Sequence, residues 1–188
     1  LIEGVNDNNG LVELLAELLK IPSDNPPGDT TAIAAFISDY LKGHGVKAEI
    51  IVTKPGIANI VATIGEGDSH LILNGHLDTF PAEVGEDWTV PPYSGLVKDG
   101  RIYGRGAGDM KGGLASLLYC FAKISKADFE GKLTFTGTSD EETGGEWGAL
   151  WLLNKDDRLH GDAVLNGEPS GLTVRIGEKS RVAIILER

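Results

Sequence analysis

The sequence contains little cysteine, few basic side chains and no long apolar run, and each shortage excludes a class of protein. The single cysteine, Cys120, cannot form an internal disulfide, so we expect a cytoplasmic protein, although a first residue of Leu1 rather than Met leaves a removed leader open. No apolar run approaches the roughly 18 residues that span a bilayer, so we expect no membrane partner. Lys and Arg number 17 against 28 Asp and Glu, and the net charge of −11 argues against nucleic acid as a partner.

The apolar residues, 41% of the 188, suffice for the core of one domain, and their spacing predicts both strands and helices. Helices are expected to begin near residues 9, 29, 111 and 146. Strands are expected at 48–52, 59–64, 70–74, 95–97, 101–103, 132–136, 163–166, 172–176 and 182–186. Strands that alternate with helices predict an α/β fold, a layered sheet flanked by helices.

The stretch YGRGAGDMKGG at residues 103–113 joins an expected hairpin to an expected helix. Its glycines let the backbone turn sharply and approach another group closely, at an entropic cost that a plain linker has no reason to carry. Asp109 is the only carboxylate in the stretch and stands where the helix begins. We therefore expect the position of the Asp109 carboxylate to serve a function.

One histidine and several carboxylates follow expected strands closely. They are His76 and Asp78 after 70–74, Asp109 after the hairpin, Glu141 and Glu142 after 132–136, and Glu168 after 163–166. The carboxyl ends of strands form the crevice in which open α/β sheets bind ligands, so these side chains should converge there. Five carboxylates at close range repel one another unless cations neutralise them. Two divalent cations would do so, and a donor set of histidine nitrogen and carboxylate oxygen suits zinc.

The spacing of these residues also suggests roles. In an extended chain, residues i and i+2 share a face, so Asp78 can orient the ring of His76 without competing for the metal. Glu141 and Glu142 are neighbours and should point apart, so that one binds metal while the other reaches the attacking water. Asp109 lies between the two groups in sequence and is the natural bridge between two metals about 3.5–4 Å apart.

Four ordered motifs resemble those of a known enzyme family. They are GHLDT at 75–79, YGRGAGDMKGG at 103–113, SDEE at 139–142 and NGEPS at 166–170. Together they resemble the zinc aminoacylase/carboxypeptidase family, which includes acetylornithine deacetylase, succinyl-diaminopimelate desuccinylase and carboxypeptidase G. The similarity extends over essentially the whole chain.

The resemblance implies two Zn²⁺ ions per complete catalytic domain, with Co²⁺ or Mn²⁺ as substitutes. It implies that His76 and Glu168 hold one ion, that Glu142 holds the other and that Asp109 bridges them. It further implies that Glu141 is the general base and that Asp78 orients His76. A cis peptide bond between Asp109 and Met110 is also implied, and such bonds are rare outside proline.

The resemblance also predicts how the chain is organised. Residues 1–177 correspond to the N-terminal segment of the zinc-dependent catalytic domain, and residues 178–188 to the entry of a lid or dimerisation domain. Family members continue through that lid, which carries substrate contacts and forms the homodimer, and then return with one more histidine for the second zinc. We therefore expect the chain to be a fragment, or the ordered part of a longer protein.

Each residue of the expected site also has an ordinary structural explanation. Asp109 could cap a helix, His76 could be a core histidine, 140–142 could be a solvated acidic turn and Glu168 could be a loop residue. The glycines of 104–108 imitate a dinucleotide-binding loop, but Asp109 occupies the place of its third glycine. Because all the motifs occur together and in order, we favour the metal site. Outside it, we expect Cys120 to pack in a helix core, and Lys111 either to touch the site or to be solvated.

The sequence therefore predicts a zinc-dependent hydrolase of the amide bond of an N-acyl amino acid, of deacetylase or desuccinylase type. One alternative is a metallo-carboxypeptidase or dipeptidase of the same family, which would take a short peptide. Another is a metal-binding fragment without catalytic activity. A glycosidase that uses Glu141 and Glu142 is disfavoured, because adjacent residues rarely hold the two sides of a sugar.

Overall fold

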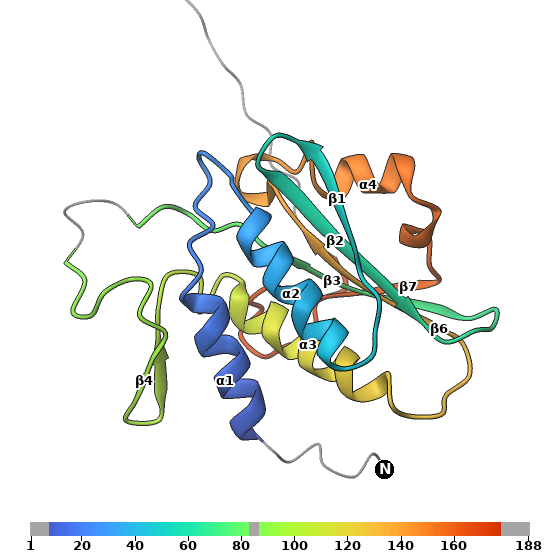
Figure 1. Ribbon diagram of the computed structural model, residues 1–188, viewed down its shortest axis with the longest axis horizontal. Helices are drawn as coiled ribbons and strands as arrows, with labels where there is room; N and C mark the ends of the chain where they lie inside the picture. Colours follow the sequence, from blue (N-terminus) through green and yellow to red (C-terminus); the bar gives the residue numbers. More distant parts are fainter. Residues whose placement is uncertain (1–7, 83–86, 178–188) are drawn as a thin grey trace, which may run out of the picture.

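The computed structural model describes residues 8–82 and 87–177, which form a mixed five-stranded sheet with helices on both faces (Figure 1). Its strands are β1 (Glu49–Lys54), β2 (Ile57–Ile64), β3 (His70–His76), β6 (Lys132–Thr138) and β7 (Ala163–Asn166). Their order is β1-β2-β6-β3-β7. Strands β6, β3 and β7 are parallel, whereas β1 and β2 are antiparallel to their neighbours. The predicted α/β layered sheet is confirmed.

Three helices cover one face of the sheet and a shorter one covers the other. The three are α1 (Asn8–Leu19), α2 (Thr31–Gly43) and α3 (Lys111–Ile124). Helix α4 (Ala149–Lys155) lies on the opposite side with the short 3₁₀ helix η2 (Asp157–Leu159). The alternation of side chains along the strands divides the core accordingly. Ile60 and Phe135 pack in the cluster with α1–α3, whereas Val61 and Ile72 pack with α4.

A separate hairpin precedes α3 and is formed by β4 (Leu96–Lys98) and β5 (Arg101–Tyr103). Asp99 and Gly100 connect the strands with φ angles of 52° and 71°, the positive values that a tight hairpin turn requires. The hairpin predicted from the Asp-Gly pair is confirmed. Among the described residues, no helix is long and apolar enough to span a bilayer.

Three sequence-based expectations about secondary structure and packing differ from the structure. Residues 172–176 form no strand, because no neighbouring strand of the described chain pairs with them, and Leu172 has a positive φ of 59°. Helix α4 begins at Ala149 rather than near 146, since Gly148 at its N-cap adopts a non-helical backbone conformation with φ −103° and ψ −113°. Cys120 is exposed on α3 instead of packing in its core. The expected strand at 182–186 and the lid entry at 178–188 lie outside the described residues.

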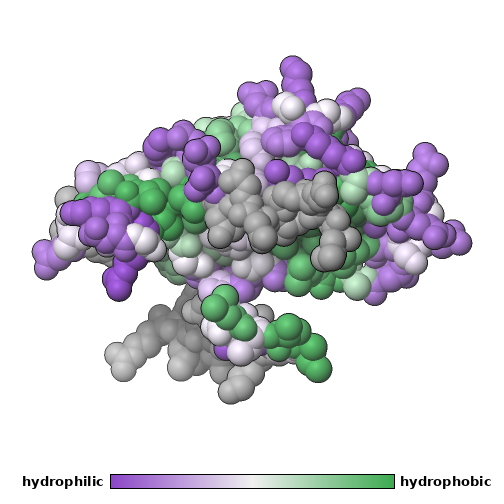
Figure 2. All heavy atoms as spheres, turned by 90° about the horizontal axis from the view of Figure 1, so that it is seen from below, coloured by the Kyte–Doolittle hydropathy of each residue, from purple (hydrophilic) through white to green (hydrophobic). Residues whose placement is uncertain are grey.

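The surface mixes hydrophilic areas with several apolar patches (Figure 2). Much of the exposed apolar surface of the sheet belongs to β7, where Val164 and Leu165 are 61% and 52% exposed. Successive strand residues point to opposite faces of the sheet, so β7 is exposed on both faces, which was not expected. The chain therefore buries one edge of its sheet much less than its centre.

Candidate metal centre

The site lies where the three parallel strands end. His76 is the last residue of β3 and stands opposite Thr138, the last residue of β6. Glu168 follows β7 by two residues, and Glu141 and Glu142 begin the 3₁₀ helix η1 (Glu141–Thr143) after β6. Because parallel strands end at the same edge of a sheet, residues distant in sequence meet there. This convergence agrees with the sequence-based expectation.

His76 stands at the centre of the cluster and is 2% exposed. Its Nδ1 lies 2.8 Å from the backbone oxygen of Asp78. A carbonyl oxygen only accepts hydrogen bonds, so Nδ1 carries the proton and Nε2 of the neutral ring keeps its lone pair. Nε2 lies 3.2 Å from Asp109 Oδ1, 3.6 Å from Glu168 Oε1 and 3.9 Å from Glu141 Oε2.

This arrangement fits a cation. A lone pair that faces three carboxylates repels them unless a proton or a metal ion lies between. Burial lowers the pKa of His76, but the nearby carboxylates, above all those of Asp78 and Glu168, outweigh burial and raise it above its ordinary value. Two overlapping triads place one donor atom of each member within 4.8 Å of the others. They are His76–Asp109–Glu168 and His76–Glu141–Glu142.

Glu142 responds to the same crowding of negative charge. Burial raises its pKa, His76 lowers it, and the carboxylates of Asp109, Glu141 and Asp78 raise it further, to about 7. Glu141 and Glu142 do not point apart as expected, because both offer an oxygen to the triad with His76. The backbone here is a 3₁₀ turn that follows Asp140 at a φ of 67°, rather than an extended strand.

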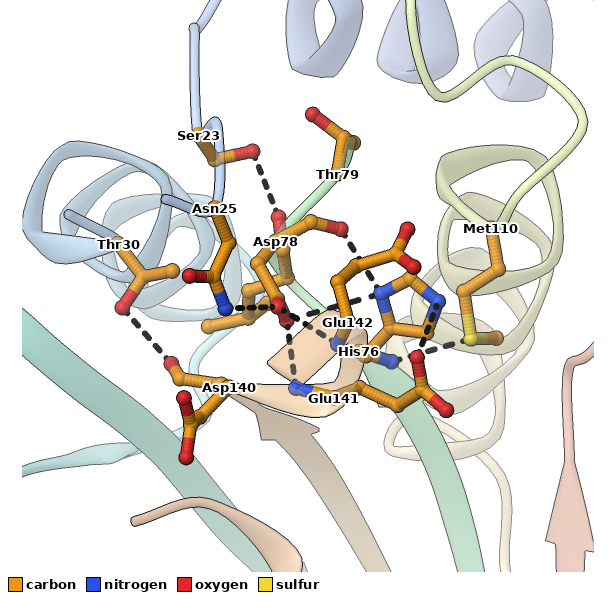
Figure 3. A network of polar contacts seen from close by, with 12 residues as sticks. Ser23, Asn25, Thr30, His76, Asp78, Thr79, Met110, Asp140, Glu141 and Glu142 are labelled. Carbon is orange, nitrogen blue, oxygen red and sulfur yellow. Dashed lines mark hydrogen bonds and ion pairs between the residues drawn. The ribbon is translucent and has the colours of Figure 1, made fainter. Parts of the chain in front are cut away.

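Asp78 is fully buried, and its carboxylate holds the turn that carries the two glutamates (Figure 3). Oδ1 accepts the backbone N–H of Glu141 at 3.2 Å, and Oδ2 accepts that of Glu142 at 3.1 Å. Oδ2 also accepts the side-chain amide of Asn25 at 2.8 Å. The carboxylate lies 3.7 Å from His76 Nδ1, so its backbone oxygen makes the closer contact to the ring.

The glycine-rich stretch delivers Asp109 to the cluster. Gly106 adopts a φ of +82° and accepts a hydrogen bond from the backbone N–H of Lys111, which closes the loop. The cis peptide bond between Asp109 and Met110 is present, as the resemblance implied. Met110 occupies the N-cap position of α3 and no side chain caps the helix, so Asp109 does not serve as its cap.

Lys111 has a role that the sequence did not suggest. Its side chain is fully buried, and Nζ donates to the backbone oxygens of Leu18 at 3.2 Å and Ile21 at 2.7 Å. Burial lowers its pKa to about 8, although the charge of Asp24 opposes the shift. Lys111 therefore ties the end of α1 to the start of α3, and its side chain is buried rather than solvated.

A cavity of about 240 Å³ opens beside the cluster. The glycine-rich stretch from 104 to 109 forms one wall, and Phe80, Trp88 and Glu142 complete the lining. The guanidinium carbon of Arg105 lies 5.0 Å from the centre of the Trp88 ring, in cation–π contact. A small organic group would therefore have room next to Asp109 and Glu142.

Close backbone packing joins the two sides of the site. A Cβ atom at Gly113, in the first turn of α3, would lie 1.9 Å from the backbone oxygen of Gly167. No side chain fits such a space, so glycine is required for α3 to approach the loop that carries Glu168. Asp109 and Glu168 can then face the same histidine nitrogen.

Comparisons with known proteins agree with this geometry. The model of the peptidase family M20/M25/M40 matches residues 72–183, more than half of the chain. The succinyl-diaminopimelate desuccinylase of Nautilia profundicola is 36% identical over 187 residues, which cover 95% of this chain and 48% of the relative. The chain thus spans about half the length of this curated relative.

Solved structures share the fold. Human carnosine dipeptidase 1 superposes with a TM-score of 0.73 at 24% identity, over 85% of this chain and 38% of that protein. The M20 metallo-carboxypeptidase Sso-CP2 of Sulfolobus solfataricus gives 0.70 at 24% identity, over 86% and 37%. The convergence of strand ends, the fold and the match over 72–183 lead to one conclusion: the chain belongs to the peptidase family M20/M25/M40.

Proposed function

We propose that this chain supplies part of the catalytic centre of a zinc-dependent hydrolase that cleaves the amide bond of an N-acyl amino acid. The observation that carries the proposal is the position of His76 Nε2 within 3.9 Å of three carboxylates from three separate segments. Such a constellation is costly for a structural role, because its charges repel without a cation. The 36% identity to a desuccinylase favours an acylated amino acid as substrate.

Each residue of the site would have a separate role in metal binding or catalysis. His76 and Glu168 would hold one ion, Glu142 the second, and Asp109 both. When bound, the two metal ions would make a water molecule more acidic and polarise the amide carbonyl. Glu141 would accept the proton of the attacking water and return it to the amine that leaves. Asp78 would keep Glu141 and Glu142 in place through their backbone N–H groups.

Replacement of the base tests the proposal. In the protein at its full natural length, Glu141→Gln should lower kcat on N-succinyl or N-acetyl amino acids about 10²- to 10⁴-fold, the usual contribution of general base catalysis. The zinc content should stay unchanged. Glu146→Gln is a matched control, since Glu146 is exposed five residues further on. Turnover retained by the Glu141 variant would contradict the assignment.

The alternative is a metallo-carboxypeptidase or dipeptidase with the same site. Parallel assays on N-acyl amino acids and on unblocked dipeptides separate the two, because the preferred substrate has the higher kcat/KM. The 188-residue chain itself, assayed with added zinc, tests whether this portion is a metal-binding unit without turnover.

A further inference from the structure

The carboxylate of Asp78 connects the base and a metal ligand to a loop near the start of the chain. It receives the backbone N–H groups of Glu141 and Glu142 and a third donor, the side-chain amide of Asn25. An ionised carboxylate only accepts hydrogen bonds, so the nitrogen of the Asn25 amide must face it. Asn25 is 4% exposed, and its amide lies within the network drawn in Figure 3.

Asn25 also contacts the far end of the same turn. Its Nδ2 lies 3.0 Å from Oγ1 of Thr143, the last residue of η1. One amide group thus touches both Asp78, beyond the end of β3, and the 3₁₀ turn that carries Glu141 and Glu142. Displacement of this amide would change the position of the turn relative to His76.

The loop around Asn25 is built to hold that side chain. The backbone N–H of Asn25 donates to the oxygen of Thr79 at 2.8 Å, and the N–H of Thr79 donates to Ser23 at 3.0 Å. Gly28 closes the loop through a 2.8 Å bond from its N–H to the oxygen of Asp24. Its φ is +87°, and a Cβ there would lie 3.1 Å from Asn25 Oδ1, so the turn folds tightly around the amide.

We propose that Asn25 is a positioning residue for hydrolysis: it fixes the Asp78 carboxylate and the η1 turn, and thereby aims Glu141 and Glu142. This role rests on the proposed function, since it concerns the aim of the proposed base. The Asn25 amide donates to the Asp78 carboxylate and to the Thr143 hydroxyl. Its effect is transmitted through Asp78 and Thr143.

Asn25→Ala tests the role in the full-length, zinc-loaded protein. We expect kcat to fall about 10- to 100-fold, the usual effect of losing a hydrogen-bond partner behind a metal site, with KM and zinc content close to wild type. The backbone amide protons of Glu141 and Glu142 should exchange with solvent faster, because their acceptor is no longer fixed. Hydrogen exchange gives this result independently of turnover.

Ser23→Ala is the matched control. Ser23 is equally buried and in the same loop, and its hydroxyl donates to the backbone oxygen of Leu77 at 2.7 Å without touching the Asp78 carboxylate. If the loop had only a structural role, Asn25→Ala and Ser23→Ala would change kcat and hydrogen exchange to the same extent. The positioning role predicts faster exchange at Glu141 and Glu142, and the larger loss of kcat, in the Asn25 variant only.

Asn25→Asp keeps the size of the side chain and covers the case in which the alanine variant does not fold. When protonated, the new carboxyl can donate to Asp78 in place of the amide, and when ionised it repels Asp78. Its kcat relative to wild type should therefore rise as the pH is lowered.

Three results would overturn the role. The first is a kcat of Asn25→Ala within twofold of wild type with unchanged hydrogen exchange, and the second is an equal effect of Asn25→Ala and Ser23→Ala on kcat and exchange. The third is a ratio of Asn25→Asp kcat to wild-type kcat that does not change with pH. If wild type hydrolyses no amide, the proposed function fails, while the exchange of Glu141 and Glu142 still decides whether Asn25 positions them.

Discussion

Strands β3 and β7 are neighbours in one sheet and each leads to an expected metal ligand, yet the fold holds them very differently. β3 lies between two strands, and its residue Ile72 is 2% exposed. β7 is an edge strand, and Val164, which pairs with Ile72, is 61% exposed. The ligands follow the same trend, since the side chain of His76 is 2% exposed and that of Glu168 is 35% exposed.

This difference indicates that the site has a rigid half and a more open half. His76 and Asp78 are buried and hydrogen-bonded, so their positions are fixed by the core. Glu168 depends on a short edge strand and on the close approach of Gly113 to Gly167. Changes on the β3 side should therefore affect stability, whereas changes on the β7 side should affect mainly the geometry of the site.

The paired residues Ile72 and Val164 test the comparison directly. Ile72→Ala should lower the free energy of unfolding by about 2–4 kcal/mol, because it leaves a cavity in the core around α4. Val164→Ala removes surface that is already exposed and should cost less than about 1 kcal/mol. Urea denaturation of both variants measures the difference. Equal losses would show that β7 is as firmly packed as β3.

A change at Gly113 tests the open half. In Gly113→Ala the new methyl group would meet the Gly167 oxygen, so the loop with Glu168 must move away from Asp109. Misplacement of a site residue by about 1 Å can reduce turnover up to about 10²-fold, and we expect a loss of about 10-fold or more with zinc affinity reduced. Gly43→Ala is the control, since no atom lies within 4 Å of a Cβ there. Unchanged turnover and zinc affinity in Gly113→Ala would contradict the role of this contact.

The loop before the hairpin offers a smaller, pH-dependent effect. The Tyr93 hydroxyl donates to Asp24 at 2.6 Å, and burial, the hydrogen bond and the charge of Asp24 raise its pKa to about 12. A phenol with a raised pKa stabilises the fold fully below about pH 10, its ordinary pKa, and this stabilisation is lost as the pH rises towards 12.

Tyr93→Phe should therefore lower stability by on the order of 1.5 kcal/mol at pH 8, the low end for a hydrogen bond to a charged group. The difference from wild type should shrink above about pH 10. Thermal unfolding at several pH values measures it, and a difference that grows with pH would refute the assignment.

Periodicity and motif order predicted the sheet, the hairpin and the meeting of His76, Asp109, Glu141, Glu142 and Glu168, because these follow from where strands end. Cys120 was assigned wrongly, because Leu117, Leu118 and Phe121 face the core, whereas Cys120 lies on the exposed side of the same helix. Such an error concerns which face of a helix points to the core, and a short apolar run defines this orientation poorly.

Asn25 and Lys111 were missed for a different reason. Their partners lie far away in sequence, at Asp78 for Asn25 and at Leu18 and Ile21 for Lys111. Burial of a polar side chain depends on such distant partners, and no local pattern encodes it. The Pro-Pro-Gly sequence after Asn25 was the available signal, since a tightly closed loop places its residues in defined positions.

We propose that the carboxylates around His76 hold two cations. The most direct test of this proposal is the zinc content of the full-length protein after removal of all metal and reloading, measured together with that of Glu168→Ala. We expect two tightly bound ions per catalytic domain in wild type and one in the variant. No bound zinc in wild type, or two ions retained without Glu168, would contradict it.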